Sequence, residues 1–231
     1  MGTFVDALQF IVDNPGLLWD KTVETLLLSG AALGVAMALA IPLGVWLGHI
    51  HGGSFIAINA SNVGRALPSL ALISIGLALL GVGFLNVMVA LVILAAPVML
   101  TNAYVAVEQV DPDAVRAARA MGMRPTQVLW RVELPLALPL MFAGIRTAAV
   151  YVVATTPLAA LAGGEGLGDI IVNQSTYGIE GVVGASIVIA ALAFATDGVF
   201  SLIQRLVTPR GLRRRGKERI VEPSVEPVGA G

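Results

Sequence analysis

Few side chains in this sequence have the types and spacing that catalysis needs. The chain has no cysteine and two histidines, His49 and His51, so thiol chemistry is excluded and a metal site is not supported. Arg146 and Asp197 are charges inside apolar segments, but they do not supply the nucleophile, base and pocket of an enzyme. No Walker-type lysine motif for ATP binding occurs. We therefore predict a chain without a cofactor or catalysis of its own, and we expect both histidines in a loop.

Arg146 is the most unusual of these residues, because an arginine within an apolar helix is costly unless it finds a partner or reaches water. If its helix begins at Pro139, Arg146 lies about 10 Å along it, within reach of the inner surface or of Asp197. We favour a structural pair of Arg146 with Asp197, and an inner gate is the alternative. Thr155 and Thr156 either line a path or pack helices together, since threonine does both in membranes.

The elements that must position these residues are transmembrane helices. Of the 231 residues 57% are hydrophobic and 13% charged, which excludes an ordinary soluble domain. A membrane-spanning helix needs roughly 20 apolar residues, and the unbroken run from Leu85 to Leu100 does not alternate as a barrel strand would. We predict an all-α polytopic transmembrane bundle of about five spans. The expected spans are residues 22–47, 59–80, 86–107, 139–161 and 181–203.

Basic residues set the expected orientation, because lysine and arginine are retained on the cytoplasmic side of short loops. With the amino terminus outside, the arginines that flank the spans fall on the inner side, and only Lys21 falls outside. We divide the chain into an interfacial segment 1–21, a transmembrane domain 22–207 and a mobile cytoplasmic tail 208–231, whose basic run contacts anionic lipid. We expect no cleaved signal peptide. The glycines of 163–168 follow no strand, which favours an outer turn over a phosphate loop.

The longest inner connection, 108–138, has the residue pattern of a helix with defined ends. Asp111 can cap the helix, Pro112 suits its first position, and Asp113 places negative charge at the positive end of the helix dipole. Gly122 can supply the left-handed residue that ends it. This helix is too short to span a membrane, so we predict a cytoplasmic element that meets a partner.

One face of this helix carries small or slender apolar residues, namely Ala114, Ala117, Ala118 and Met121. A second short helix is expected over 126–133, before Pro135 and Pro139 interrupt the chain. A helix that lies on lipid would bury larger side chains such as leucine or phenylalanine. The narrow face therefore favours insertion into a cleft of a protein partner over attachment to the membrane surface.

The stretch Arg116-Ala117-Ala118-x-x-x-Gly122, followed by Val132-x-Leu134-Pro135, resembles the EAA loop of bacterial ABC importer permeases. In that family the loop is a coupling helix that inserts into the ATP-binding subunit, so the resemblance implies ATPase partner subunits. Arg116 stands where the family usually has glutamate, which reverses a charge at the docking surface. The residues expected to couple to the ATPase are Ala114, Arg116, Ala117, Ala118, Met121, Gly122, Val132, Leu134 and Pro135.

The resemblance covers residues 64–209 and is strongest to permeases for osmoprotectants such as glycine betaine, choline and carnitine. The stretches that carry it are 64–72, 132–139, 143–148 and 163–169. It implies a type I ABC importer permease fold in the bacterial cytoplasmic membrane, surrounded by lipid. It also implies a second permease subunit, identical or paralogous, and an extracytoplasmic substrate-binding protein, and no nucleic-acid partner is expected.

Other functions stay open as alternatives. Permeases for an amino acid such as methionine share parts of these patterns, and a non-transporting assembly subunit would have the same architecture. A secondary transporter would show paired ionisable residues at the midplane and inverted repeats, which this sequence lacks. The aromatic residues that could hold a quaternary ammonium group are scattered over three spans, so we expect selectivity to lie in the binding protein. These residues are Trp46, Tyr104, Phe142 and Tyr151.

Overall fold

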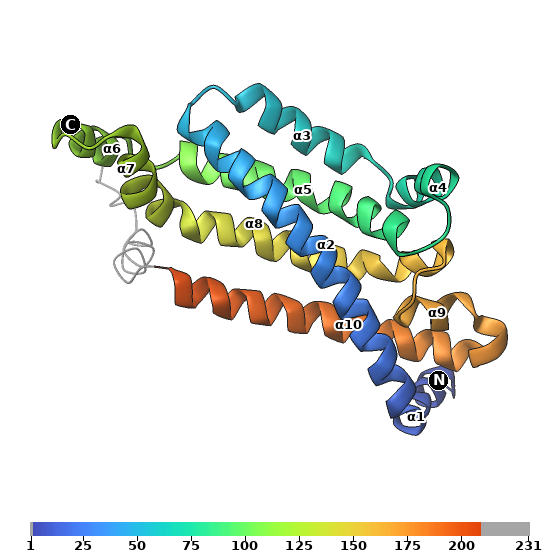
Figure 1. Cartoon of the computed structure of the whole chain (residues 1–231). Helices are drawn as coiled ribbons and strands as arrows, with labels where there is room; N and C mark the ends of the chain where they lie inside the picture. The colour runs from blue at the N-terminus through green and yellow to red at the C-terminus, as the bar shows by residue number, and fades with distance from the viewer. Residues whose placement is uncertain (1, 209–231) are drawn as a thin grey trace, which may run out of the picture.

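The computed structural model describes residues 2–208, and over that range the chain forms helices joined by short turns (Figure 1). This confirms the predicted all-α class. The elements are α1 (Gly2–Asp13), α2 (Pro15–His49), α3 (Ser54–Ala66), α4 (Ser69–Leu80), α5 (Phe84–Glu108), α6 (Pro112–Ala120), α7 (Pro125–Val128), the π-helical turn η1 (Leu129–Glu133), α8 (Leu134–Thr155), the 3-10 helix η2 (Thr156–Ala162), α9 (Leu167–Val172) and α10 (Gln174–Val207). Apart from Thr208, the predicted tail 208–231 lies outside the described residues.

Four helical stretches among residues 2–208 are long and apolar enough to cross a membrane. These stretches are Pro15–His49, Phe84–Glu108, Pro125–Ala162 and Gln174–Val207. They contain four of the predicted spans, and α5 alone, with 25 residues, is about 37 Å long, more than the roughly 30 Å hydrocarbon core. Helix α2 begins at Pro15, so the boundary predicted at residue 21 falls inside a helix, because proline is well suited to the first helical position.

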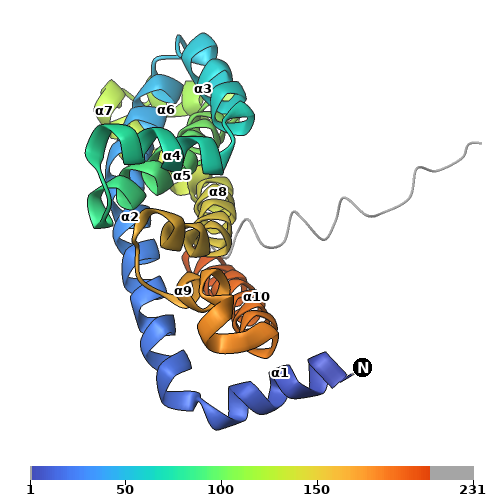
Figure 2. The same ribbon diagram turned by 90° about the vertical axis from the view of Figure 1, so that its right-hand side faces the viewer.

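The predicted second span, 59–80, is not a single helix. It is divided between α3 and α4 at Pro68, which has φ −67° and ψ 127°. Proline has no N–H to donate and disfavours helical geometry in the residue before it, so the chain bends there. Helix α3 lies along α5, where Thr101 Oγ1 donates to the Ala57 carbonyl oxygen at 3.1 Å, and α4 runs across the end of the bundle (Figures 1 and 2).

The interruption predicted at Pro135 and Pro139 is wrong, because the helical stretch continues from Pro125 to Ala162. The backbone widens at η1, where the Leu134 amide donates to the carbonyl of Leu129, five residues back. Pro135 follows directly at the start of α8, a position that tolerates a missing N–H. The second half of the predicted inner connection is therefore the first part of a long helix.

Helix α5 is the centre of the bundle, and its apolar side chains contribute to the two larger core clusters. Helix α2 lies very close to it through Gly44 and Gly48, two glycines on one helix face. A Cβ atom added to Gly44 would lie 2.6 Å from the carbonyl oxygen of Leu100, and one added to Gly48 would lie 2.8 Å from that of Tyr104. The backbones therefore touch, and we call these two helices the α2–α5 pair.

A side chain at Gly48 is expected to separate the α2–α5 pair. Because the atoms nearest to the added Cβ belong to the α5 backbone and to Val107, the Gly48→Val variant should lose about 1–3 kcal/mol of stability. Gly34→Val is the matched control in the same helix, since nothing lies within 4 Å of its added Cβ. Thermal melting of both purified variants measures the difference, and equal melting temperatures would contradict the close approach.

The two ends of the bundle carry different elements. Figure 1 shows α6 and α7 projecting at one end, while α1, α4 and α9 gather at the other. Helix α1 crosses beside α9 and α10 (Figure 2), and Phe10 packs edge-on against Tyr177 with ring centroids 6.5 Å apart. With 12 residues, α1 is too short to span a bilayer, and its interfacial location stays a prediction.

Candidate functional site

The helix predicted in the inner connection is α6, and both of its ends have the predicted chemistry. Asp111 Oδ1 accepts a hydrogen bond from the amide of Asp113 at 2.9 Å, and Pro112 is the first helical residue. At the other end Gly122 has φ +81°, and its amide donates to the Arg119 carbonyl at 3.0 Å. The next amide donates to the Ala118 carbonyl at 3.2 Å, which completes a Schellman motif.

The predicted apolar face of this helix is divided in the structure. Ala118 is 1% exposed and Ala114 half-buried, so these two face the chain's own helices. Ala117 is exposed and Met121 is 72% exposed. Arg116, which stands at the family's usual glutamate position, is exposed and pairs with the Asp113 carboxylate within α6. We call the exposed residues Arg116, Ala117, Ala120 and Met121 the α6 surface.

The second half of the predicted motif serves the packing of the chain itself. Leu134 packs with Val115 and Leu129 against an apolar cluster that includes Ala137, and Val132 and Pro135 are half-buried in the long helix. Trp130, in contrast, is 70% exposed in η1, which contacts α6. No pattern in the sequence pointed to Trp130, although a tryptophan in a charged inner segment is a usable signal for an interface.

A second contact at this end was also not predicted. His49 is the last residue of α2, so its expected place in a loop is wrong, whereas His51 does lie in the turn that follows. His49 Nδ1 lies 2.6 Å from Oε2 of Glu133, whose side chain is 1% exposed. The helix extends to His49 because this contact and the close packing of α2 on α5 hold its last turn.

The predicted partners Arg146 and Asp197 do meet, between α8 and α10. Arg146 Nε lies 2.6 Å from Asp197 Oδ1, and the second guanidinium nitrogen lies 2.5 Å from Oδ2, so the pair is bidentate. Their side chains are 34% and 40% exposed and line a cavity of about 450 Å³ with Gln204. Gln204 Nε2 also donates to the Pro139 carbonyl at 2.8 Å. These bonds fasten α8 to α10.

Loss of one member of the Arg146–Asp197 pair is expected to harm folding more than loss of both. Arg146→Ala leaves a lone carboxylate and Asp197→Ala a lone guanidinium within an apolar bundle, whereas the double alanine variant leaves neither charge. Fluorescence-detected size-exclusion chromatography of heated samples gives the melting temperature of each variant. If the pair is structural, the melting temperature of the double variant should be higher than that of either single variant. Normal melting of both single variants together with lost transport would instead favour the inner gate.

Thr155 is the last residue of α8 and Thr156 the first of η2, near the end of the bundle opposite to α6. Thr155 Oγ1 donates to the Tyr151 carbonyl at 2.7 Å, and this residue is 8% exposed. Thr156 is 1% exposed, and its hydroxyl lies 2.7 Å from that of Ser29 in α2. Thr156 thus joins helices in the interior, and a role of either threonine in lining a path stays a prediction.

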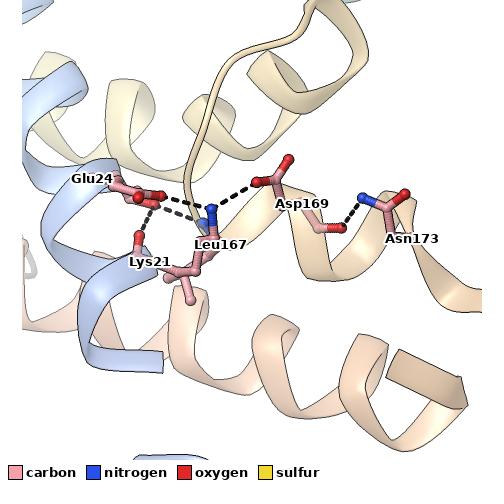
Figure 3. A network of polar contacts seen from close by, with 6 residues as sticks. Lys21, Glu24, Leu167, Asp169 and Asn173 are labelled. Carbon is pink, nitrogen blue, oxygen red and sulfur yellow. Dashed lines mark hydrogen bonds and ion pairs between the residues drawn. The ribbon is translucent and has the colours of Figure 1, made fainter. Parts of the chain in front are cut away.

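The segment around α9 is tied to the first turns of α2 by polar contacts that Figure 3 shows. Lys21 Nζ lies 2.8 Å from Asp169 Oδ2 and 2.9 Å from Glu24 Oε2. The Leu167 amide donates to Thr25 Oγ1 at 3.0 Å. Residues 163–166 form a turn, as expected, whereas Gly168 of the predicted turn lies in α9. Glu24 and Glu165 border a cavity of about 410 Å³ at this end.

Nothing in residues 2–208 resembles a metal centre, since no group of three potential ligands is found there. An apolar cavity of about 400 Å³ lies between α2, α8 and α10. The chain is thus a helical bundle with an exposed short helix, α6, at one end. At the other end the contacts of Lys21 with Asp169 and of Leu167 with Thr25 hold α9 to α2.

Comparison with known proteins gives consistent matches over most of the chain. A family model described as "Binding-protein-dependent transport system inner membrane component" matches residues 30–211. The choline transport system permease protein OpuBB of Bacillus subtilis (strain 168) is 35% identical over 207 residues, which cover 89% of this chain and 95% of the relative. The osmoprotectant import permease protein OsmW of Salmonella typhimurium (strain LT2) is 30% identical over 215 residues, which cover 90% of this chain and 100% of the relative.

Solved structures show the same fold. A chain from inward-facing conformations of the MetNI methionine ABC transporter superimposes with a TM-score of 0.72 at 24% sequence identity. The superposition covers 84% of this chain and 97% of the other. At this identity the likeness establishes the arrangement of helices and carries no information on the substrate.

Proposed function

The chain belongs to the inner membrane components of binding-protein-dependent transport systems, and from this premise we propose that it forms the transmembrane path for a small osmoprotectant such as choline, glycine betaine or carnitine. Family membership confirms the predicted ABC importer permease and its multi-pass location in the bacterial inner membrane. In such systems separate ATPase subunits hydrolyse ATP, and a substrate-binding protein delivers the substrate. The likeness to the MetNI transporter confirms the predicted type I permease fold.

The observation that carries the substrate class is the similarity to osmoprotectant permeases over nearly the whole chain. The relatives named for choline, carnitine and glycine betaine match 85–95% of its length. The methionine transporter resembles it at 24% identity, which supports the fold alone. An aromatic cage is not needed within this chain if the binding protein selects the substrate, which agrees with the scattered positions of Trp46 and Tyr151.

We assign coupling to the ATPase to the α6 surface together with Trp130. Helix α6 projects from one end of the bundle, its exposed residues at 117 and 120 are small, and small side chains let a partner approach closely. Gly122 ends the helix with a left-handed residue, so the surface has a defined shape. The inward half of the motif, including Ala118 and Leu134, holds the surface to the long helix.

The orientation and the assembly follow from this assignment. If α6 meets an ATPase, its end of the bundle is cytoplasmic, and the end with the Lys21–Asp169 contact and α4 is extracytoplasmic. The arginines of α6 agree with this orientation. We also propose that lipid surrounds the bundle and that a second permease, identical or paralogous, completes the path, because one bundle of four long helices and one broken span is too small to enclose it.

Uptake of radiolabelled compounds tests the proposed function. Cells with and without this chain are given choline, glycine betaine, carnitine or methionine at trace concentration, with the binding protein and ATPase present. We expect uptake of at least one quaternary amine to depend on the chain. Dependence of methionine uptake alone would overturn the substrate class. An assembly subunit would instead be dispensable for quaternary amine uptake but required for formation of the complex.

A further inference from the structure

The buried carboxylate of Glu133 has no part in the coupling surface described above. Its side chain is 1% exposed, and Oε2 lies 2.6 Å from Nδ1 of His49. The other oxygen, Oε1, is buried and has no hydrogen-bond partner in the described part of the chain. A buried carboxylate is unfavourable unless it is paired, so the contact with His49 is what allows Glu133 to stay inside.

Glu133 occupies the end of the π-helical turn η1, between the short helix α7 and the long helix α8. A π-helical turn is wider than an α-helical one and is frequent at functional sites. Here it lies where the chain leaves α6 and α7, which together we call the coupling segment. A movement of α6 and α7 would be absorbed at this turn if nothing fixed the turn to the rest of the bundle.

His49 belongs to the α2–α5 pair. It directly follows Gly48, whose missing side chain lets α2 touch the backbone of α5. Helix α5 ends at Glu108, and the cap of α6 is Asp111, so the same pair also carries the entry to the coupling segment. The start of the coupling segment is therefore joined to the α2–α5 pair by the chain itself. Its end is joined to the same pair by the contact of His49 with Glu133, which lies 84 residues further along the chain.

We propose that the His49–Glu133 contact is the joint that fastens the exit of the coupling segment to the α2–α5 pair, so that a movement of α6 reaches both spans. This inference rests on the proposed function, because it takes α6 as the element that the ATPase moves. His49 and Glu133 are positioning residues: they touch no substrate and act through the helices that they hold. The unpartnered Oε1 fits a joint that exchanges partners between two conformations of the transporter.

The test uses the complete transporter, with ATPase subunits and binding protein, in proteoliposomes. Radiolabelled choline uptake and ATP hydrolysis are measured together, which gives the number of choline molecules transported per ATP. We expect His49→Ala and Glu133→Leu each to lower this ratio about tenfold, a typical magnitude for the coupling between two sites, while hydrolysis continues. The double variant should be no worse than either single one, because both changes break the same contact.

His51→Ala is the matched control, because this exposed histidine is two residues from His49 and its ring is hydrogen-bonded to the His49 carbonyl oxygen and not to Glu133. Its ratio should equal that of the unchanged chain. A proportional loss of uptake and hydrolysis in His49→Ala, with the ratio unchanged, would overturn the joint and leave a packing role. Additive losses in the double variant would overturn it as well.

His49→Ala leaves the buried Glu133 carboxylate without its partner, whereas Glu133→Leu removes the charge together with the contact. Should His49→Ala fail to assemble, Glu133→Leu alone therefore decides, by the same ratio. Failure of the proposed function is recognised separately. If Ala117→Arg on the α6 surface transports normally, coupling does not pass through α6 and the premise fails. If Ala117→Arg is inactive and His49→Ala has a normal ratio, the premise stands and the joint alone is refuted.

Discussion

The Ala117→Arg variant is expected to lose transport and keep its fold. Ala117 is exposed on α6, so a longer side chain there can extend into the solvent. A long charged side chain there would hold the ATPase away from the helix. Since changes at the centre of an interface cost about 2 kcal/mol or more, uptake should fall at least about tenfold. The measurement is choline uptake in cells, with the amount of chain in the membrane determined in parallel.

The matched control at the same position is Ala117→Ser, which keeps the side chain small and exposed. Its uptake should equal that of the unchanged chain if size is what the docking requires. Copurification of the ATPase subunits with each variant adds a second reading: the arginine variant should lose them and the serine variant retain them. Full uptake by the arginine variant would show that the α6 surface does not carry the coupling.

The Gly168→Val variant is expected to prevent folding of the end of the bundle that carries η2 and α9. A Cβ atom added to Gly168 would lie 2.0 Å from the carbonyl oxygen of Pro157 and 2.7 Å from its carbonyl carbon. These are backbone atoms, so no side chain can rotate away, and η2 and α9 would have to separate. Overpacking costs about 1–3 kcal/mol where neighbours can adjust, and the cost here should exceed about 3 kcal/mol.

The amount of folded chain extracted from membranes, read by size-exclusion chromatography, measures this effect. Gly198→Val is the control, because the site in α10 has nothing within 4 Å of its added Cβ. Gly168→Val should remove the monodisperse peak, and Gly198→Val should leave it unchanged. A normal peak for Gly168→Val would mean that η2 and α9 do not pack as closely as the structure has them.

Features that depend on neighbouring residues could be predicted from the sequence. The cap at Asp111, the first helical residue Pro112 and the left-handed Gly122 each act within four residues, and the structure has all three as expected. The pairing of Arg146 with Asp197 could also be predicted, although 51 residues separate them. These two were charges in apolar spans, and each needed a partner of opposite sign.

Features set by contacts across the bundle could not be predicted. The pairing of His49 with Glu133 spans 84 residues, and that of Lys21 with Asp169 spans 148, and no local pattern relates their members. The burial of Ala118 and exposure of Ala117 depend on which side of α6 meets the long helix. Helical periodicity groups these alanines on one face but does not say where the neighbouring helix lies.

Proline had opposite consequences at two places that looked alike in the sequence. Pro68 divides the predicted second span into α3 and α4, whereas Pro135 lies in a continuous helical stretch. The π-helical turn before Pro135 accommodates the missing N–H, and the last residue of that turn, Glu133, is buried against His49. Hydropathy alone does not separate the two cases, because both prolines lie beside apolar runs.

Cross-linking from the α6 surface tests the central claim most directly. The chain has no cysteine, so Met121→Cys has a single thiol at a position that is 72% exposed, and Val82→Cys, 73% exposed at the opposite end, is its control. Each is labelled with a photoreactive maleimide in the complete transporter within membranes, and mass spectrometry identifies the adducts. We predict an adduct of residue 121, and none of residue 82, with the ATP-hydrolysing subunit. An ATPase adduct from residue 82, or only lipid adducts from residue 121, would contradict coupling through α6.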